Sequence, residues 1–378
     1  MDFNFTENQI MIRDLARGIL DKEVTADRLK AVQADPDWCD RVLWSTLAHA
    51  GLLGIVVPER VGGMGFGIAE ACVLLHEIGR VVAPLPVLPT VVLAGLPIAE
   101  FGTDEQQTEW LVPLAAGTTM LTGAIVDAAS ADPGKPATSA RRDGTGWVLE
   151  GEKHFVPAAH LAERILVPAA TPDGGGLFLV SPRADGITLT SHRISSGERL
   201  HTVTLSGVRV AARDLLGGDA RSGAQRASWI YERALVAICA TQLGVSEKAL
   251  ELTSNYVRQR EQFGVPIGTF QAVQHRSADC FIDLTAMRWV TWRAVWKLAN
   301  GMPATRDTAV AKFWAAEGGC RIANAAQHLH GGIGVDVDYP LHRYFVWSKA
   351  LELSLGGATP HLVQLGQDMA RSGPQELA

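Results

Sequence analysis

The spacing of apolar side chains along the chain changes twice. Residues 1–120, and the residues from about 222 onward, place apolar side chains every three or four positions, as amphipathic helices do. Between 121 and 220, short apolar runs alternate with Pro, Gly and Asp, which is typical of strands joined by turns. The pattern therefore predicts a mainly α protein with a central β domain.

Local signals refine the first of these regions. Thr6 and Gln9 have the spacing of a capping box ahead of an apolar helical stripe that starts at Ile10. Helical spacing returns over 43–53 and 68–78. The glycine cluster between these segments, Gly62-Gly63-Met64-Gly65, follows no predicted strand and lacks the spacing of a dinucleotide loop, so it predicts a turn.

In the central region, residues 147–156 read as a hairpin centred on Gly151, and the short strands that follow favour a small β-barrel or sandwich. We therefore expect three domains, over residues 1–120, 121–220 and 221–378. The further strands are predicted at 164–167, 177–180, 187–190 and 203–205, and the later helices at 226–260, 270–298, 305–330 and from Leu362 onward.

Composition narrows the function classes. The net charge is −6 and no run of Lys or Arg stands out, which argues against nucleic acid as a partner. No apolar run reaches the length of a membrane span, and the first residues lack the basic start of a signal peptide. Five cysteines lie far apart without a C-x-x-C pair, so we expect reduced thiols in a cytoplasmic protein.

The stretch from Arg258 to Gln274, RQREQFGVPIGTFQAVQ, is the most informative segment. Two arginines, amide side chains and a tight Gly turn suit a phosphorylated ligand, although an ordinary helix end with solvated charges would have a similar composition. The stretch resembles the flavin-contacting signature R-x-x-F-G-x-x-x-x-x-x-Q of the acyl-CoA dehydrogenase family. Arg260, Phe263, Gly264 and Gln271 match it.

Further segments carry the same resemblance over nearly the whole chain. Pro58 to Gly65 resembles P-E-x-x-G-G-x-G, Gln327 to Gly334 (QHLHGGIG) resembles Q-x-x-G-G-x-G, and Tyr339 to Arg343 resembles Y-P-x-x-R. The resemblance implies an N-terminal helical domain, a small β-barrel or sandwich and a C-terminal four-helix bundle. It also implies α,β-dehydrogenation of an acyl-CoA thioester, with FAD as cofactor and electron-transferring flavoprotein as electron acceptor.

In the family, the C-terminal motifs reach the FAD of a neighbouring subunit. The cofactor-binding residues expected from the match are Arg260, Gln262, Phe263, Gln271, Gln327, Gly331, Gly332 and Gly334.

The motifs that hold a subunit's own flavin match poorly. The family's T-E-P-x-A-G-S-D loop corresponds to the segment from Thr122 to Asp132, which keeps little of it, and W-I-T-N becomes Phe155-Val156-Pro157-Ala158. The usual catalytic Glu of Y-E-G-T corresponds to Gly357, which cannot accept a proton. Some members place the base on an earlier helix, where the count lands on Ala234; Glu232 lies two residues away and is the candidate relocated base.

Three hypotheses follow from this contrast. In the first, the chain completes the FAD site of a paralogous partner in an α2β2 heterotetramer and lacks its own base; actinobacterial enzymes of this paired kind act on bulky acyl chains such as steroid side chains. In the second, it is a complete homotetrameric enzyme that uses Glu232. In the third, it is a catalytically inactive acyl-CoA-binding or scaffold protein.

Overall fold

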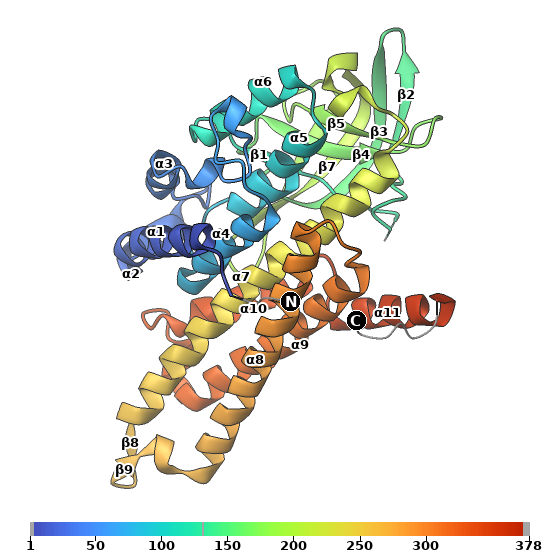
Figure 1. Cartoon of the computed structure of the whole chain (residues 1–378). Coiled ribbons are helices and arrows are strands. Elements are labelled where there is room, and N and C mark those ends of the chain that lie inside the picture. Colours follow the sequence, from blue (N-terminus) through green and yellow to red (C-terminus); the bar gives the residue numbers. More distant parts are fainter. Residues whose placement is uncertain (1–3, 131, 373–378) are drawn as a thin grey trace. The chain divides into compact units, whose positions relative to one another are not determined.

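The computed structural model describes residues 4–130 and 132–372, which form two compact units (Figure 1). The bundle unit takes the described residues within Met1–Ala26, Cys72–Ala83 and Leu235–Ala378. The β unit takes Asp27–Ala71 and Pro84–Ala234. Along the chain, helices precede and follow a central run of strands, which confirms the predicted fold class. The domain boundaries at residues 120 and 220 remain a prediction.

The β unit contains two sheets with a shared core. One sheet has the order β1-β4-β5 and the other β2-β3-β7-β6; β1 runs parallel to β4, and the remaining pairs are antiparallel. Trp147 of β3 meets Phe178 of β5 edge-on, with ring centroids 5.5 Å apart, in the apolar layer between the sheets. The strands are β1 (Leu121–Gly123), β2 (Ser139–Asp143), β3 (Gly146–Pro157), β4 (Arg164–Ala169), β5 (Gly176–Val180), β6 (Ile187–Arg193) and β7 (Arg199–Val210).

The predicted hairpin centred on Gly151 is wrong. Residues 146–157 form the single strand β3, which pairs with β7 on both sides of Gly151. Gly151 instead marks an irregularity in the register, with φ +146°, and a Cβ there would lie 2.8 Å from Thr138. The glycine therefore serves a bulge and a close approach within the strand.

The remaining elements of the β unit are mostly short helices. They are α2 (Ala26–Ala34), α3 (Arg41–His49), η1 (Leu52–Gly54), η2 (Glu59–Val61), the π-helix η3 (Leu88–Gly95), α5 (Leu96–Phe101), α6 (Asp104–Ala115), η4 (Ala212–Asp214) and η5 (Leu216–Gly218). The predicted turn at residues 62–65 is confirmed, because these residues follow η2 without regular structure.

The bundle unit is built on long helices. Its α1 (Glu7–Glu23) starts with the predicted capping box of Thr6 and Gln9. The other helices are α4 (Ile68–Val81) from Cys72 onward, α7 (Gly223–Gln259) from Leu235 onward, α8 (Gln271–Ala299), α9 (Thr305–His330), α10 (Leu341–Leu353) and α11 (Ala358–Ser372). A short hairpin, β8 (Glu261–Gln262) with β9 (Val265–Pro266), and the turns η6 (Ile267–Thr269) and η7 (Gly331–Val335) connect them. Helix α10 was missing from the sequence prediction.

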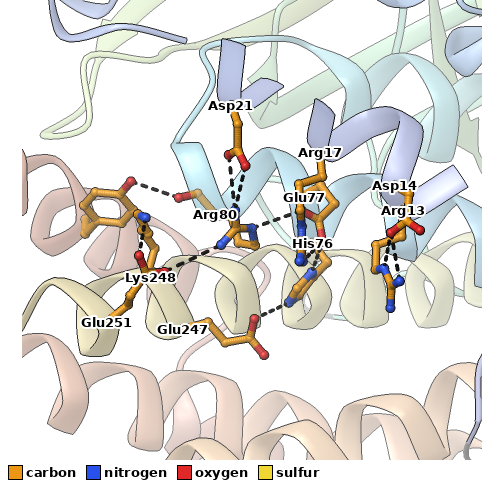
Figure 2. A network of polar contacts seen from close by, with 11 residues as sticks. Arg13, Asp14, Arg17, Asp21, His76, Glu77, Arg80, Glu247, Lys248 and Glu251 are labelled. Carbon is orange, nitrogen blue, oxygen red and sulfur yellow. Dashed lines mark hydrogen bonds and ion pairs between the residues drawn. The ribbon is translucent and has the colours of Figure 1, made fainter. Parts of the chain in front are cut away.

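Helices α4 and α7 approach each other closely inside the bundle unit. A Cβ on Gly79 would lie 2.1 Å from the carbonyl oxygen of Thr241, and one on Gly244 would lie 2.0 Å from that of His76. Beside this crossing, His76 and Glu77 join α4 to α1 and α7 through a polar network (Figure 2). Glycines at the crossing thus bring these charged groups within hydrogen-bond distance.

Within residues 4–130 and 132–372, no helix combines the length and apolarity needed to cross a membrane. All five cysteines are free thiols, and four of them are buried.

Candidate functional site

The predicted signature after α7 forms an exposed hairpin tip. Phe263 and Gly264, with φ of +56° and +81°, make the two-residue turn between β8 and β9. Phe263 is 92% exposed, and its ring makes a T-shaped contact with Phe270, with centroids 6.2 Å apart. A large apolar side chain held outward in a backbone conformation unfavourable to it suggests that another surface covers this tip.

The polar candidates of the same segment also face outward. Arg260 and Gln271 are exposed, and neither side chain has a hydrogen bond to a residue in the described ranges. Gln262 is exposed and donates only to the carbonyl of Glu261, at 2.7 Å. Arg260 is held by its backbone, because its N–H donates to Tyr256 and its carbonyl accepts from Ile267. The side chains therefore remain available to a ligand or a second chain.

The second motif lies at the same end of the bundle unit. His330, the last residue of α9, stacks on Tyr256 of α7 with ring centroids 4.4 Å apart. Its Nδ1 lies 2.8 Å from the carbonyl of Ala326, so Nδ1 donates and Nε2 accepts from the Tyr339 hydroxyl at 3.0 Å. Burial lowers the pKa of His330, which suits this neutral form. This stack brings the Arg260 and Gln327 segments together, and sequence spacing alone did not reveal it.

The three glycines of the second motif have different roles. Gly331 has φ +62°, and Gly331 and Gly332 are exposed with open space where a Cβ would stand. A Cβ on Gly334 would lie 2.6 Å from Nε2 of Gln327, so that side chain packs inward on its own chain. Gln327 also lies one residue farther from the glycines than the family pattern places its Gln. The exposed His328 stands at that place, and the sequence prediction overlooked it.

Glu232, the candidate relocated base, lies on an uninterrupted helix. Helix α7 runs from Gly223 to Gln259 without a break, so Glu232 and Ala234 project about 200° apart. Ala234 is fully buried and Glu232 half-buried. Between them, Arg233 lies over the Trp229 ring, with its Cζ 3.6 Å from the centroid, and burial lowers the pKa of Arg233 to about 10. The helix irregularity that would turn Glu232 toward the expected position does not occur.

Gly357, at the usual place of the catalytic Glu, lies in the short connection between α10 and α11. No acidic residue occurs from Leu353 to His361. A Cβ on Gly357 would meet only the Glu352 carbonyl, at 3.9 Å, so the backbone there does not require glycine. Leu355 and Gly356, by contrast, have φ of +54° and +95°.

Two buried basic side chains, those of Lys312 and His361, lie beside the connection between α10 and α11. The Lys312 ammonium donates to the carbonyls of Leu351 and Glu352, at 3.1 and 2.9 Å, and burial lowers the pKa of Lys312 to about 8. His361 Nε2 lies 3.1 Å from the carbonyl of Leu355, and burial lowers the pKa of His361. Both groups are engaged with backbone carbonyls of this connection, which fixes their positions beside Gly357.

In the β unit, the segment that corresponds to the flavin loop uses its polar side chains internally. The Thr122 hydroxyl donates to the Pro157 carbonyl at 2.7 Å. The Asp127 carboxylate accepts from the Thr138 hydroxyl at 2.8 Å and from the fully buried Lys153 ammonium. The Thr122 hydroxyl and the Asp127 carboxylate are therefore already hydrogen-bonded within the chain.

The segment that replaces W-I-T-N has two residues in the left-handed region of backbone conformation. Phe155 is 61% exposed with φ +53°, and Ala158 has φ +50°. Asparagine adopts such a conformation readily, whereas alanine does not. This segment therefore keeps a backbone suited to the family's Asn without the amide that would bind a ligand.

Comparison with known proteins identifies relatives over the full length. Models for the N-terminal and C-terminal domains of acyl-CoA dehydrogenases match residues 6–118 and 221–367. Acyl-CoA dehydrogenase FadE27 of Mycobacterium tuberculosis is 36% identical, covering 98% of this chain and 100% of that protein.

Two solved structures are similar throughout. A chain of a variant of the Tcur3481–Tcur3483 steroid ACAD has a TM-score of 0.90 and 43% identity, covering 97% of this chain and 98% of that one. A chain of the ChsE4–ChsE5 complex from M. tuberculosis has a TM-score of 0.93 and 37% identity, covering 99% and 100%.

Proposed function

Because this chain belongs to the acyl-CoA dehydrogenase family, whose enzymes are FAD-dependent oxidoreductases acting on CH–CH bonds, we propose that it is the non-catalytic subunit of an α2β2 complex. It completes the FAD site of a paralogous partner and lacks a base of its own. The proposed substrate is an acyl-CoA thioester with a bulky, steroid-derived acyl group, and the proposed acceptor is an electron-transferring flavoprotein. This proposal is supported by the similarity to a chain of the Tcur3481–Tcur3483 steroid ACAD and to a chain of the ChsE4–ChsE5 complex.

The observation that carries the proposal is the contrast between the two sets of motif residues. At the end of the bundle unit, Arg260, Phe263 and Gln271 are exposed and uncommitted, and the backbone at Gly331 and Gly332 is open. A dinucleotide fits this end, where a guanidinium, an amide and bare backbone would meet its phosphates and adenosine part.

The residues of the β unit fit the isoalloxazine part poorly. Thr122 and Asp127 are bonded within the chain, and Pro157 and Ala158 offer no donor in their side chains. FAD bound in the complex would supply the hydride-accepting chemistry. This chain would supply contacts that bind and orient the cofactor, while the proton-accepting carboxylate would come from the partner, because residues 353–361 contain none.

The test is the flavin content of the purified protein, alone and co-expressed with a paralogous acyl-CoA dehydrogenase subunit. We expect no flavin in the isolated chain and one FAD per two chains in the complex, with turnover of a steroid-derived acyl-CoA only in the complex. One FAD per chain in the isolated protein, together with turnover, would contradict the proposal and favour the homotetramer that uses Glu232. A complex without flavin or turnover would favour the acyl-CoA-binding scaffold.

A further inference from the structure

A pair of stacked histidines connects three segments of the β unit. His160, in the turn that follows β3, lies against His201 of β7, with ring centroids 4.8 Å apart and ring planes inclined by 31°. Nε2 of His160 lies 3.3 Å from the carbonyl oxygen of Asp37, in the connection between α2 and α3, and since a carbonyl only accepts, Nε2 donates. The stack therefore holds this connection against the paired ends of β3 and β7.

Each of the two rings has one nitrogen without a partner. Nδ1 of His160 and Nδ1 of His201 are enclosed, and neither has a hydrogen-bond partner among residues 4–130 and 132–372. In His160 the ring proton is on Nε2, so Nδ1 carries a lone pair. His201 is 2% exposed and its ring hydrogen-bonds to the backbone of Val156, which leaves its Nδ1 in the same state. A further proton on either ring would add a charge and an N–H group that has no acceptor.

The charged groups around the stack do not compensate for such a proton. Asp37 carries a carboxylate, but this group already pairs with Arg41 at 2.7 Å. The basic groups come from α3, β6 and β7, and they are Arg41, His192 and Arg199. Burial, and in His201 also the neighbouring His160, lowers the pKa of both rings, that of His201 to about 4. Geometry and charge thus favour two neutral rings.

We propose that the His160–His201 stack is an acid-sensitive switch, which holds the α2–α3 connection to the ends of β3 and β7 only while both rings are neutral. Two imidazolium rings at this spacing would repel each other, and the nearby arginines would add to the repulsion. Trp38 belongs to the same contact, because a Cβ on Gly197, in the turn between β6 and β7, would lie 2.7 Å from Nε1 of Trp38. Trp38 has φ +49°, which is unfavourable for a side chain of its size, so opening would also release backbone strain.

The switch should act between about pH 6.5 and pH 4. A histidine whose folded-state pKa is lowered stabilises the closed form above the pKa of a solvated ring, about 6.5, and this contribution is lost as pH falls through the folded-state pKa. Each ring that takes up a proton only on opening raises the opening equilibrium up to about tenfold per pH unit, so both together raise it up to about a hundredfold. The switch requires neither a flavin nor a partner subunit, so its failure and that of the subunit role are distinguishable.

The experiment is hydrogen exchange of the full-length chain at about pH 7, 6 and 5, read by mass spectrometry and corrected for the intrinsic pH dependence of exchange. In the wild type we expect the opening equilibrium of residues 35–40, 158–162 and 194–202 to rise tens of fold between about pH 6 and pH 5, while β4 and β5 keep their protection. His160→Gln can still donate to the Asp37 carbonyl but does not titrate, so the rise should fall to less than about tenfold. The control His192→Gln, at an exposed position of β6, should behave like the wild type.

Equal corrected exchange of the three segments at about pH 5 and pH 7 in the wild type would overturn the switch, as would an unchanged rise in His160→Gln. Uniform loss of protection over the β unit would also overturn it, because acid would then unfold the unit as a whole. If His160→Gln does not fold, His201→Phe keeps a ring in the stack without a titrating nitrogen, and we expect the same reduced rise. A rise as large as that of the wild type in this variant would refute the switch.

Discussion

Replacing His76 by glutamine would remove a charge from the polar network of the bundle unit (Figure 2). Nδ1 of His76 lies 3.1 Å from the Glu77 carboxylate, and Nε2 lies 3.0 Å from that of Glu247. Since carboxylates only accept, both ring nitrogens must donate, which requires the imidazolium form. Burial opposes this charge, but the bonds to Glu247 and Glu77 prevail and raise the pKa of His76.

The expected decrease in the free energy of unfolding depends on how many hydrogen bonds Glu77 and Glu247 keep in the variant. Two charged hydrogen bonds at 1.5–3 kcal/mol each set an upper limit of about 3–6 kcal/mol. Glutamine keeps a single donor nitrogen and no charge. Glu77 still accepts from Arg17 and Arg80, and Glu247 still accepts from Arg288. These arginines offset roughly half of the loss, so we expect His76→Gln to lower the free energy of unfolding by about 2–3 kcal/mol.

The stability that His76 contributes should decrease as pH rises. A raised pKa in the folded state means that His76 contributes fully below about pH 6.5, and the contribution is lost as pH rises through the folded-state pKa. The pKa values of Glu77 and Glu247 are lowered to about 2, because the hydrogen bond from His76, with those from the arginines, outweighs burial. Their contributions decline only in acid, below their unfolded-state pKa.

The measurement is urea denaturation of wild type, His76→Gln and the exposed control His49→Gln between about pH 6 and pH 9. Wild type and His49→Gln should lose stability across this range, and His76→Gln should start lower and lose less. Equal stability of wild type and His76→Gln at about pH 6, or the same decline in both, would refute the imidazolium assignment.

The other predictions concern the candidate site. In the complex, Arg260→Ala should weaken FAD binding by about 1.5–3 kcal/mol, measured by flavin retention during dilution, with Arg141→Gln unchanged; equal retention would exclude Arg260 as a contact. Glu232→Gln should leave turnover of the complex unaltered, because an unbroken α7 directs this carboxylate away from the expected position; loss of turnover with flavin retained would make Glu232 the base. Gly356→Ala should destabilise the chain by about 1–2 kcal/mol, since φ is +95°, whereas Gly357→Ala should cost much less; equal melting temperatures would refute this contrast.

Much of the architecture could be predicted from the sequence, because long helices carry strong periodic signals. The segment 305–330 was predicted with the same limits as α9, and the capping box at Thr6 formed as expected. The hairpin predicted at Gly151 was wrong because a glycine between apolar runs is compatible with either a turn or a β-bulge. Helix α10 was missed because Leu341–Leu353 mixes large apolar and charged residues without a clear stripe.

The candidate site was less predictable, because a polar side chain can bind a ligand only if it is not already hydrogen-bonded within the chain. The sequence identifies Thr122 and Asp127 as polar residues in a flavin-loop position, but only the fold reveals their bonds to Pro157, Thr138 and Lys153. The exposure of Phe263 could not be predicted either, because the family motif contains Phe whether or not another chain covers that side chain.

Arg343 extends this argument to groups whose partner is missing from the chain. In the sequence it is one match in Y-P-x-x-R, and such a match does not distinguish a salt-bridged arginine from an uncompensated one. Its burial and its lack of a partner appear only after every described acceptor has been placed around it. A sequence motif thus identifies the residue types at each position. Only the structure shows which of their polar groups lack a hydrogen-bond partner within the described chain. By that criterion, the end of the bundle unit keeps Arg260, Phe263 and Gln271 exposed, whereas the β-unit segment uses Thr122 and Asp127 in hydrogen bonds within the chain.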